Sequence, residues 1–310
     1  MSDASSDRPV PGGEYPLAGR PVARIGFGTA QLPRLAGDLD SAVAVLRRAV
    51  ELGVNHIDTA HFYGAGFANE ALRRALRPDD GVLVATKVGA DPDPGRPVPL
   101  KTAQRPEELR ASVEANLRSL GVERLDLVNL RRLDVGPGVQ ASGDQVVDLD
   151  DQLETMVAMR DEGLIGAIGI SAVSLDGLRR ALPAGVVCVQ NAYSLASRAY
   201  EDLLDVCVAE GLAWVPFYPL GGTFAAMPKV VEQPEVVEVA ARLGATPSQV
   251  GLAWLLGHAP NTLLIPGTSS IAHLEQNLTI GALELDAEAT AALDAVAAPG
   301  GEPIPFFRPA

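Results

Sequence analysis

Eight short, nearly all-apolar runs alternate with amphipathic helical patterns along this chain of 310 residues. The runs, which predict strands, cover residues 25–29, 54–58, 82–87, 125–131, 165–171, 186–191, 213–217 and 262–266. The predicted helices cover residues 40–52, 68–76, 106–120, 151–162, 174–182, 199–210, 235–243, 247–257 and 271–279. Short apolar strands between amphipathic helices indicate a parallel sheet that is buried on both faces. Eight such units in about 250 residues predict one closed (β/α)8 barrel of the TIM type.

The alternative architecture is an open doubly wound sheet, which usually begins with a glycine-rich turn between its first strand and helix. Here the run at 26–28, Gly-Phe-Gly, is followed neither by a third glycine nor directly by a helix, so we favour the barrel. Two short runs at 15–17 and 22–24 predict an N-terminal β-hairpin. Residues 1–14 are polar and lack periodicity, so we expect a disordered leader followed by one barrel domain over residues 15–310.

The composition restricts the class of protein. No apolar run reaches the roughly 18 residues of a membrane span and the N-terminus lacks a signal pattern, so we expect a cytoplasmic protein. A formal net charge of −14 disfavours binding to nucleic acid or to a membrane, and leaves room for an anionic cofactor in a local pocket. Cys188 and Cys207 are expected to be buried thiols. No two histidines have the spacing of metal ligands, so we expect no metal.

Polar residues stand where the predicted strands end. Asp58 ends one apolar run, and Tyr63 follows in the next loop. Lys87 and Arg131 end the next two predicted strands. The carboxyl ends of the strands meet at one face of a parallel barrel, which is where such barrels keep their chemistry. We therefore expect these four side chains to form the catalytic site.

These residues and their neighbours resemble a known family. The run 58–64, DTAHFYG, together with Lys87, with the Gln-Asn pair at 190–191 and with the run 265–270, IPGTSS, resembles the aldo-keto reductases. The resemblance extends from about residue 15 to residue 285. Residues 54–59 and 128–131 are similar to a bacterial branch of the family that includes pyridoxal reductases. The resemblance implies reduction of an aldehyde or ketone, such as a pyridoxal-like compound, with NADPH or alternatively NADH.

Reduction of a carbonyl group by hydride transfer leaves negative charge on the substrate oxygen, so the site must supply a proton. By resemblance Tyr63 is the general acid. An ammonium beside a phenol favours the phenolate and lowers the tyrosine pKa, so Lys87 is expected to tune Tyr63 and Asp58 to orient Lys87. The other interpretation is a structural Asp58–Lys87 pair beneath a surface tyrosine.

The fourth position departs from the family pattern, because Arg131 stands where members usually carry a histidine. Alternation along the strand points Arg131 into the barrel. Three roles are open. The guanidinium can donate to the carbonyl oxygen without relaying a proton, it can bind an anionic group of the substrate, or it can pair with Asp134.

The resemblance also assigns cofactor contacts. Ser171 and Gln190 match positions that hold the nicotinamide carboxamide, Asn191 can share that contact, and Phe217 matches the aromatic residue that stacks on the ring. The residues matched to the pyrophosphate, the phosphate and the adenine are, in chain order, Gly221, Gly267, Thr268, Ser269, Ser270, Gln276 and Asn277. Gly267 and His273 replace basic residues that often bind the ribose 2′-phosphate, so NADH stays an alternative to NADPH.

Other side chains and other functions fit the same pattern. His56 is expected in the core, His61 at the mouth of the pocket, and the tail at 303–308 over the barrel mouth. A cofactor-binding partner that senses redox state is one alternative function. A non-redox isomerase or dehydratase, with Arg131 holding an anionic substrate, is the other.

Overall fold

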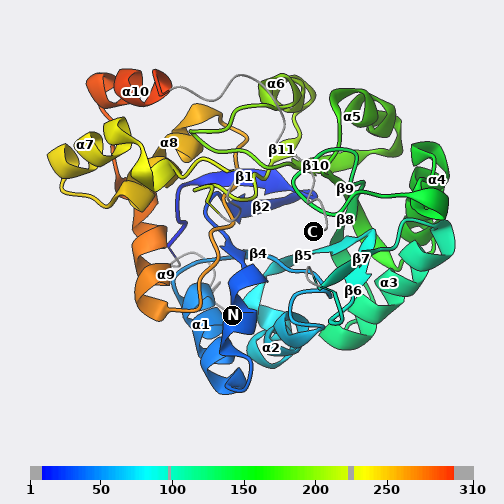
Figure 1. The fold of residues 1–310 in the computed structure, drawn as a ribbon. Helices are drawn as coiled ribbons and strands as arrows, with labels where there is room; N and C mark the ends of the chain where they lie inside the picture. Colours follow the sequence, from blue (N-terminus) through cyan, green and yellow to red (C-terminus); the bar gives the residue numbers. More distant parts are fainter. Residues whose placement is uncertain (1–8, 97–98, 223–226, 297–310) are drawn as a thin grey trace.

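Seven parallel strands form a curled sheet at the centre of the molecule, and the helices lie around its outside (Figure 1). The strands, in chain order, are β3 (Phe27–Gly28), β4 (His56–Asp58), β5 (Leu83–Val88), β8 (Leu125–Arg131), β9 (Ile165–Ser171), β10 (Val186–Gln190) and β11 (Ala213–Trp214). They neighbour one another in this same order, as successive β/α units do. The computed structural model describes residues 9–96, 99–222 and 227–296.

The predicted eighth strand closes this sheet into a barrel with few backbone contacts. Thr262 forms a parallel bridge with Trp214 at one edge, and Leu264 forms another with Ile25 at the opposite edge. Residues 262–264 therefore join the first and the last strand. The predicted (β/α)8 fold is confirmed, but its first, second, seventh and eighth strands are shorter than predicted.

The helices of the ring follow the predicted positions closely. They are α1 (Leu39–Glu51), α2 (Phe67–Ala75), α3 (Pro106–Leu120), α4 (Leu149–Asp161), α5 (Leu175–Ala181), α6 (Glu201–Glu210), α7 (Pro234–Leu243), α8 (Pro247–His258) and α9 (Ile271–Leu278). Local chemistry sets their starts: the Asp38 carboxylate accepts from the Ser41 N–H at the start of α1, and Pro106 and Pro234 open α3 and α7.

The structure also holds a hairpin and a helix that were not predicted. A short antiparallel hairpin, β6 (Ala90–Pro92) and β7 (Leu100–Thr102), follows β5. A last helix, α10 (Ala287–Asp294), follows the final β/α unit. The hairpin strands have three residues each, which is too short for an alternating pattern to stand out.

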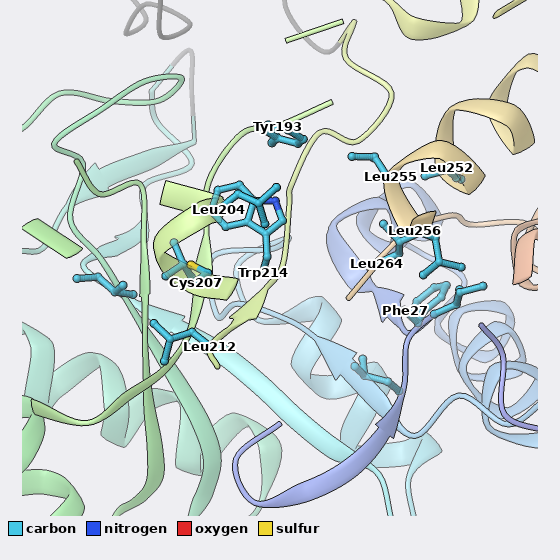
Figure 2. Packing of buried hydrophobic residues seen from close by; sticks show 14 of the residues in the cluster. Phe27, Tyr193, Leu204, Cys207, Leu212, Trp214, Leu252, Leu255, Leu256 and Leu264 are labelled. Atoms are coloured by element: carbon cyan, nitrogen blue, oxygen red, sulfur yellow. The ribbon is translucent and has the colours of Figure 1, made fainter. Parts of the chain in front are cut away.

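Alternation along the strands divides the apolar side chains between two cores. In β8, Val128 and Leu130 belong to the outer core between sheet and helices, whereas Leu127 belongs to the core inside the barrel. Figure 2 shows part of the outer core, where Cys207 of α6 packs near Trp214. Cys188 lies in the inner core, so the prediction of two buried free thiols is confirmed.

The predicted N-terminal hairpin, β1 (Glu14–Leu17) and β2 (Arg20–Ala23), covers the amino ends of the strands. Leu17 and Val22 pack into the inner core. The Ala23 N–H donates to Oδ1 of Asn55, directly before β4, at 2.7 Å. This end of the barrel is thereby filled, so access from outside is confined to the carboxyl end.

The folded part of the chain starts before the predicted boundary at Tyr15. The N–H groups of Arg24 and Ile25 donate to the backbone oxygens of Gly13 and Pro11 at 2.7 and 3.1 Å. Residues 1–8 and the tail at 303–308 lie outside the described residues. None of the helices in the described ranges combines the length and the hydropathy of a membrane-spanning segment.

Candidate active site

The centre of the site is a buried ion pair between two neighbouring strands. Asp58 ends β4, and Lys87 lies near the end of β5. The Lys87 ammonium donates to Oδ1 of Asp58 and, at 3.0 Å, to the backbone oxygen of Thr59. Only 5% of Lys87 and 3% of Asp58 are exposed. Either charge alone would be costly to bury, so each side chain holds the other in place.

Gln190 holds the second oxygen of the same carboxylate. It ends β10, and its Nε2 donates to Oδ2 of Asp58 at 2.8 Å. Oε1 of Gln190 is buried and has no hydrogen-bond partner among the described residues. Gln190 therefore fixes the Asp58 carboxylate and leaves one buried acceptor for a ligand that carries N–H groups.

Opposing effects set the pKa of the Lys87 ammonium. Burial lowers this pKa, but the neighbouring Asp58 and Tyr63 outweigh burial and raise it above its ordinary value. Lys87 is therefore a cation throughout the neutral range. A fixed positive charge of this kind stabilises negative charge that develops nearby.

Tyr63 lies beside this cation. The Lys87 Nζ is 5.0 Å from the centroid of the Tyr63 ring, and Phe62 meets the same ring edge-on with the centroids 5.0 Å apart. Positive φ angles at residues 64–66 turn the chain back into α2 directly after Tyr63. Gly64 and Gly66 adopt such angles without strain, and Ala65 is held at φ +51° between them, so the loop can hold Tyr63 over the ion pair.

Arg131 ends β8 and lies in the same neighbourhood. Its guanidinium carbon stands 5.9 Å from the centroid of the Phe62 ring. The predicted alternative of a pair between Arg131 and Asp134 is wrong, because Asp134 binds Arg132 at 3.0 Å instead. Nε of Arg131 is buried without a hydrogen-bond partner, and no carboxylate of the described residues pairs with this guanidinium. Two of the three predicted roles of Arg131 remain.

The residues predicted for the nicotinamide lie at adjoining strand ends. Ser171 ends β9 and pairs in the sheet with Arg131 on one side and Gln190 on the other. Phe217 is half-buried after β11 and packs against Tyr218. Asn191 differs from the prediction: its side-chain amide donates to the backbone oxygen of Val173 at 2.8 Å and accepts from the Val173 N–H at 3.1 Å. Asn191 therefore anchors the backbone after β9 rather than facing the site.

The packing of the loops explains why glycine stands at positions 221 and 267, which were predicted to contact the cofactor. A Cβ at Gly221 would lie 1.8 Å from the backbone oxygen of Pro228, and φ there is +66°. A Cβ at Gly267 would lie 2.5 Å from the backbone oxygen of Gly28. Both positions need a backbone without a side chain for the loops to pack, whether or not a phosphate binds there.

The predicted phosphate and adenine positions gather at the start and along the length of α9. Oγ1 of Thr268 accepts from the Ser270 N–H at 3.1 Å, and Oγ of Ser270 caps α9 by accepting from the His273 N–H. Ser269 and Asn277 are half-buried and Gln276 is exposed. The loop thus presents hydroxyl groups and a helix N-terminus, which suit a phosphate. The cofactor roles of these residues stay predictions.

Two side chains at the site, Tyr218 and Asn129, were not among the residues predicted from the sequence. Tyr218 has a positive φ of 54°, and burial raises the pKa of its hydroxyl while the charges of Arg131 and Lys87 oppose this in part. Oδ1 of Asn129 accepts from the Cys188 thiol at 3.3 Å, and its Nδ2 has no partner among the described residues. Strand alternation indicates the inward direction of Asn129, but nothing in the sequence indicates the backbone conformation of Tyr218.

His61 was predicted at the mouth of the pocket, and that position stays a prediction. His61 lies at a hollow of about 710 Å³ on the outer surface, together with Gly66 of the loop and Arg118 of α3. Burial lowers the pKa of His61. His56 is a core histidine as predicted, since only 2% of it is exposed.

Comparisons with known proteins agree with this geometry. The model of the Aldo/keto reductase family matches residues 24–298. Pyridoxine 4-dehydrogenase of Escherichia coli (strain K12) is 41% identical over 289 residues, which are 91% of this chain and 97% of that protein. An aldo-keto reductase from Klebsiella pneumoniae, crystallised in complex with NADPH, superposes with a TM-score of 0.77 at 27% identity, covering 94% of this chain and 96% of that one. The chain belongs to the aldo/keto reductase family and is an NAD(P)H-dependent oxidoreductase.

Proposed function

We propose that this protein reduces a small, pyridoxal-like aldehyde to the alcohol with NADPH, and that Tyr63 donates the proton. The relative named pyridoxine 4-dehydrogenase supports the substrate class. The structures of relatives in complex with NADPH and with NADP support the cofactor. The observation that carries the proposal is the buried Lys87–Asp58 pair beside the Tyr63 ring.

Each residue has a distinct task in this proposal. The Tyr63 hydroxyl donates its proton to the carbonyl oxygen as negative charge develops there. The Lys87 cation stabilises the phenolate that remains on Tyr63, and Asp58 holds Lys87 in position. Gln190 keeps the Asp58 carboxylate from turning, since it binds the other oxygen.

The residues fit a nicotinamide cofactor. NADPH, when bound, supplies the hydride. Oε1 of Gln190, which is buried and has no partner in the part of the chain that the structure describes, is an acceptor that suits the N–H groups of a carboxamide. Ser171 lies beside Gln190, and the Phe217 ring offers an apolar face across the mouth. The loop at 267–270 offers its hydroxyls and the start of α9 to a phosphate.

The test is turnover of pyridoxal by the purified protein and by its Tyr63→Phe variant, followed through NADPH absorbance. Tyr63→Phe should lose about 10²- to 10⁴-fold in kcat, because a general acid contributes that much, while NADPH binding persists. Tyr15→Phe is the matched control, since Tyr15 lies in the hairpin at the other end of the barrel.

Two outcomes would contradict the proposal. Equal turnover by wild type and Tyr63→Phe would remove Tyr63 from the chemistry. Tight NADPH binding without turnover of pyridoxal or of simple aldehydes and ketones would favour the redox-sensing or non-redox alternative. The reverse reaction, pyridoxine with NADP, should depend on Tyr63 to the same degree.

A further inference from the structure

Two consecutive arginines at the end of β8 have different surroundings. Arg132 is satisfied within the protein: it pairs with Asp134 at 3.0 Å and donates to the backbone oxygen of Val147 at 3.1 Å. The guanidinium of Arg131 has no hydrogen bond to the described residues, and its Nε is buried. A half-buried cation without a counter-charge is costly, so such a group is expected to have a partner that the protein does not supply.

The backbone of Arg131 is held by two buried glutamines, and the residue itself is half-buried. Its carbonyl oxygen accepts from Nε2 of Gln104 at 2.8 Å, and the same amide donates to the backbone oxygen of Gly89 at 2.6 Å. Nε2 of Gln152 donates in turn to Oε1 of Gln104 at 3.0 Å. Both glutamines are buried. The backbone at the end of β8 is therefore fixed before any ligand arrives.

An aromatic ring and a glycine lie next to the Arg131 guanidinium. The Phe62 ring lies beneath it at 5.9 Å, and a Cβ at Gly138 would lie 3.0 Å from its Nη2. Tyr218 is near enough that Arg131 and Lys87 both act on the pKa of its hydroxyl. Phe62 also packs against Tyr63. A flat, aromatic substrate whose carbonyl group meets Tyr63 would thus bring its next ring substituent toward Arg131.

We propose that Arg131 selects aromatic aldehydes that carry an ionised oxygen on the ring carbon next to the one bearing the aldehyde group. One guanidinium can donate two parallel hydrogen bonds, one to the carbonyl oxygen and one to the neighbouring anionic oxygen. An aldehyde without that oxygen accepts only one bond and leaves the positive charge uncompensated. This inference rests on the proposed reductase function and specifies its substrate class.

The test compares pyridoxal, whose ring hydroxyl is next to the aldehyde group, with its 3-O-methyl ether. Wild type should prefer pyridoxal in kcat/KM by roughly 10- to 100-fold, the value of a hydrogen bond between charged groups. Arg131→Gln should lose most of that preference by lowering kcat/KM for pyridoxal far more than for the ether. Arg131→Lys should keep part of the preference, because the charge remains while the paired donors are lost. Arg118→Gln, in an exposed side chain of α3, is the matched control.

Binding gives a readout that does not need turnover. Calorimetry of the NADPH complex with pyridoxine and with 3-O-methylpyridoxine, two alcohols that NADPH cannot reduce, should show the same preference, and the same loss in Arg131→Gln. Equal affinities in wild type overturn the inference even if no aldehyde is reduced. An equal loss of kcat/KM for both aldehydes in Arg131→Gln also overturns it, since Arg131 would then act on the carbonyl oxygen alone. Absence of turnover with the binding preference intact would contradict the reductase proposal instead.

Discussion

Lys87 donates to the Asp58 carboxylate across two neighbouring strands, and both side chains are almost completely buried. The pair lies at the carboxyl end of the barrel, beside Tyr63. Its position gives it two consequences. It supplies a permanent cation to the chemistry, and it makes each partner dependent on the other for the stability of the fold.

The first prediction concerns that dependence. Lys87→Met leaves the Asp58 carboxylate buried without its cation and should lower the free energy of unfolding by about 3–5 kcal/mol. Asp58→Asn should also destabilise, because Lys87 then lacks its carboxylate. The double variant should cost clearly less than the sum of the two single variants, since it buries no unpaired charge. Urea unfolding of all four proteins measures this coupling, and additive effects would show that the pair contributes no stability.

The second prediction concerns the stability of the folded protein at acidic pH. Burial lowers the pKa of His56 from 6.5 to about 4, and the backbone of Ala23 offsets this only in part. The unfolded chain takes up a proton near pH 6.5, whereas the folded protein does not until about pH 4, so stability falls as the pH drops through this window. The loss attributable to His56 should be about 2 kcal/mol between pH 7 and pH 5.

Urea unfolding at pH 7 and at pH 5 measures the loss of stability that His56 causes. His56→Leu should remove most of this acid sensitivity, and His273→Gln, in an exposed side chain, should leave it unchanged. An acid sensitivity that His56→Leu retains would mean that other groups cause it.

The third prediction concerns the space beneath the ion pair. A Cβ at Gly169 would lie 2.1 Å from Oδ1 of Asn129 and 2.6 Å from the Cys188 sulfur. Gly169→Ala should therefore destabilise by about 1–3 kcal/mol through overpacking. It should also impair turnover, because Asn129 lies in the strand pair beside Lys87.

Gly257→Ala is the matched control. Gly257 lies in α8, where a Cβ would meet nothing within 4 Å, so alanine should stabilise by up to about 1 kcal/mol. Thermal unfolding compares the two variants. A neutral Gly169→Ala would show that the inner core can shift to admit a methyl group.

The fourth prediction concerns the cofactor. Phe217→Ala should weaken NADPH binding about 10-fold by removing the aromatic face at the barrel mouth, because aromatic stacking contributes about 1 kcal/mol beyond burial. Phe217→Tyr keeps the ring and should bind NADPH nearly as wild type does. Quenching of protein fluorescence by NADPH measures both. Unchanged binding in Phe217→Ala would make this ring a packing residue only.

Local pattern determined the architecture, because strand and helix periodicities are properties of neighbouring residues. It also brought Asp58, Lys87, Tyr63 and Arg131 to one face, since the strand ends of a parallel barrel converge whatever the loops do. Even the inward direction of Arg131 follows from alternation along β8.

Contacts between residues far apart in the sequence were decided only by the tertiary structure. Asn191 was predicted to hold a ligand, but Val173, from another β/α unit, takes both ends of its amide. The sequence predicted Asp134 as a possible partner of Arg131. In the structure Asp134 pairs with Arg132 instead, because the chain after β8 places Asp134 beside Arg132. The sequence likewise does not show that, among the described residues, Oε1 of Gln190 and the guanidinium of Arg131 have no partner. An unsatisfied polar group is defined by every neighbour around it, and those neighbours come together only when the barrel closes.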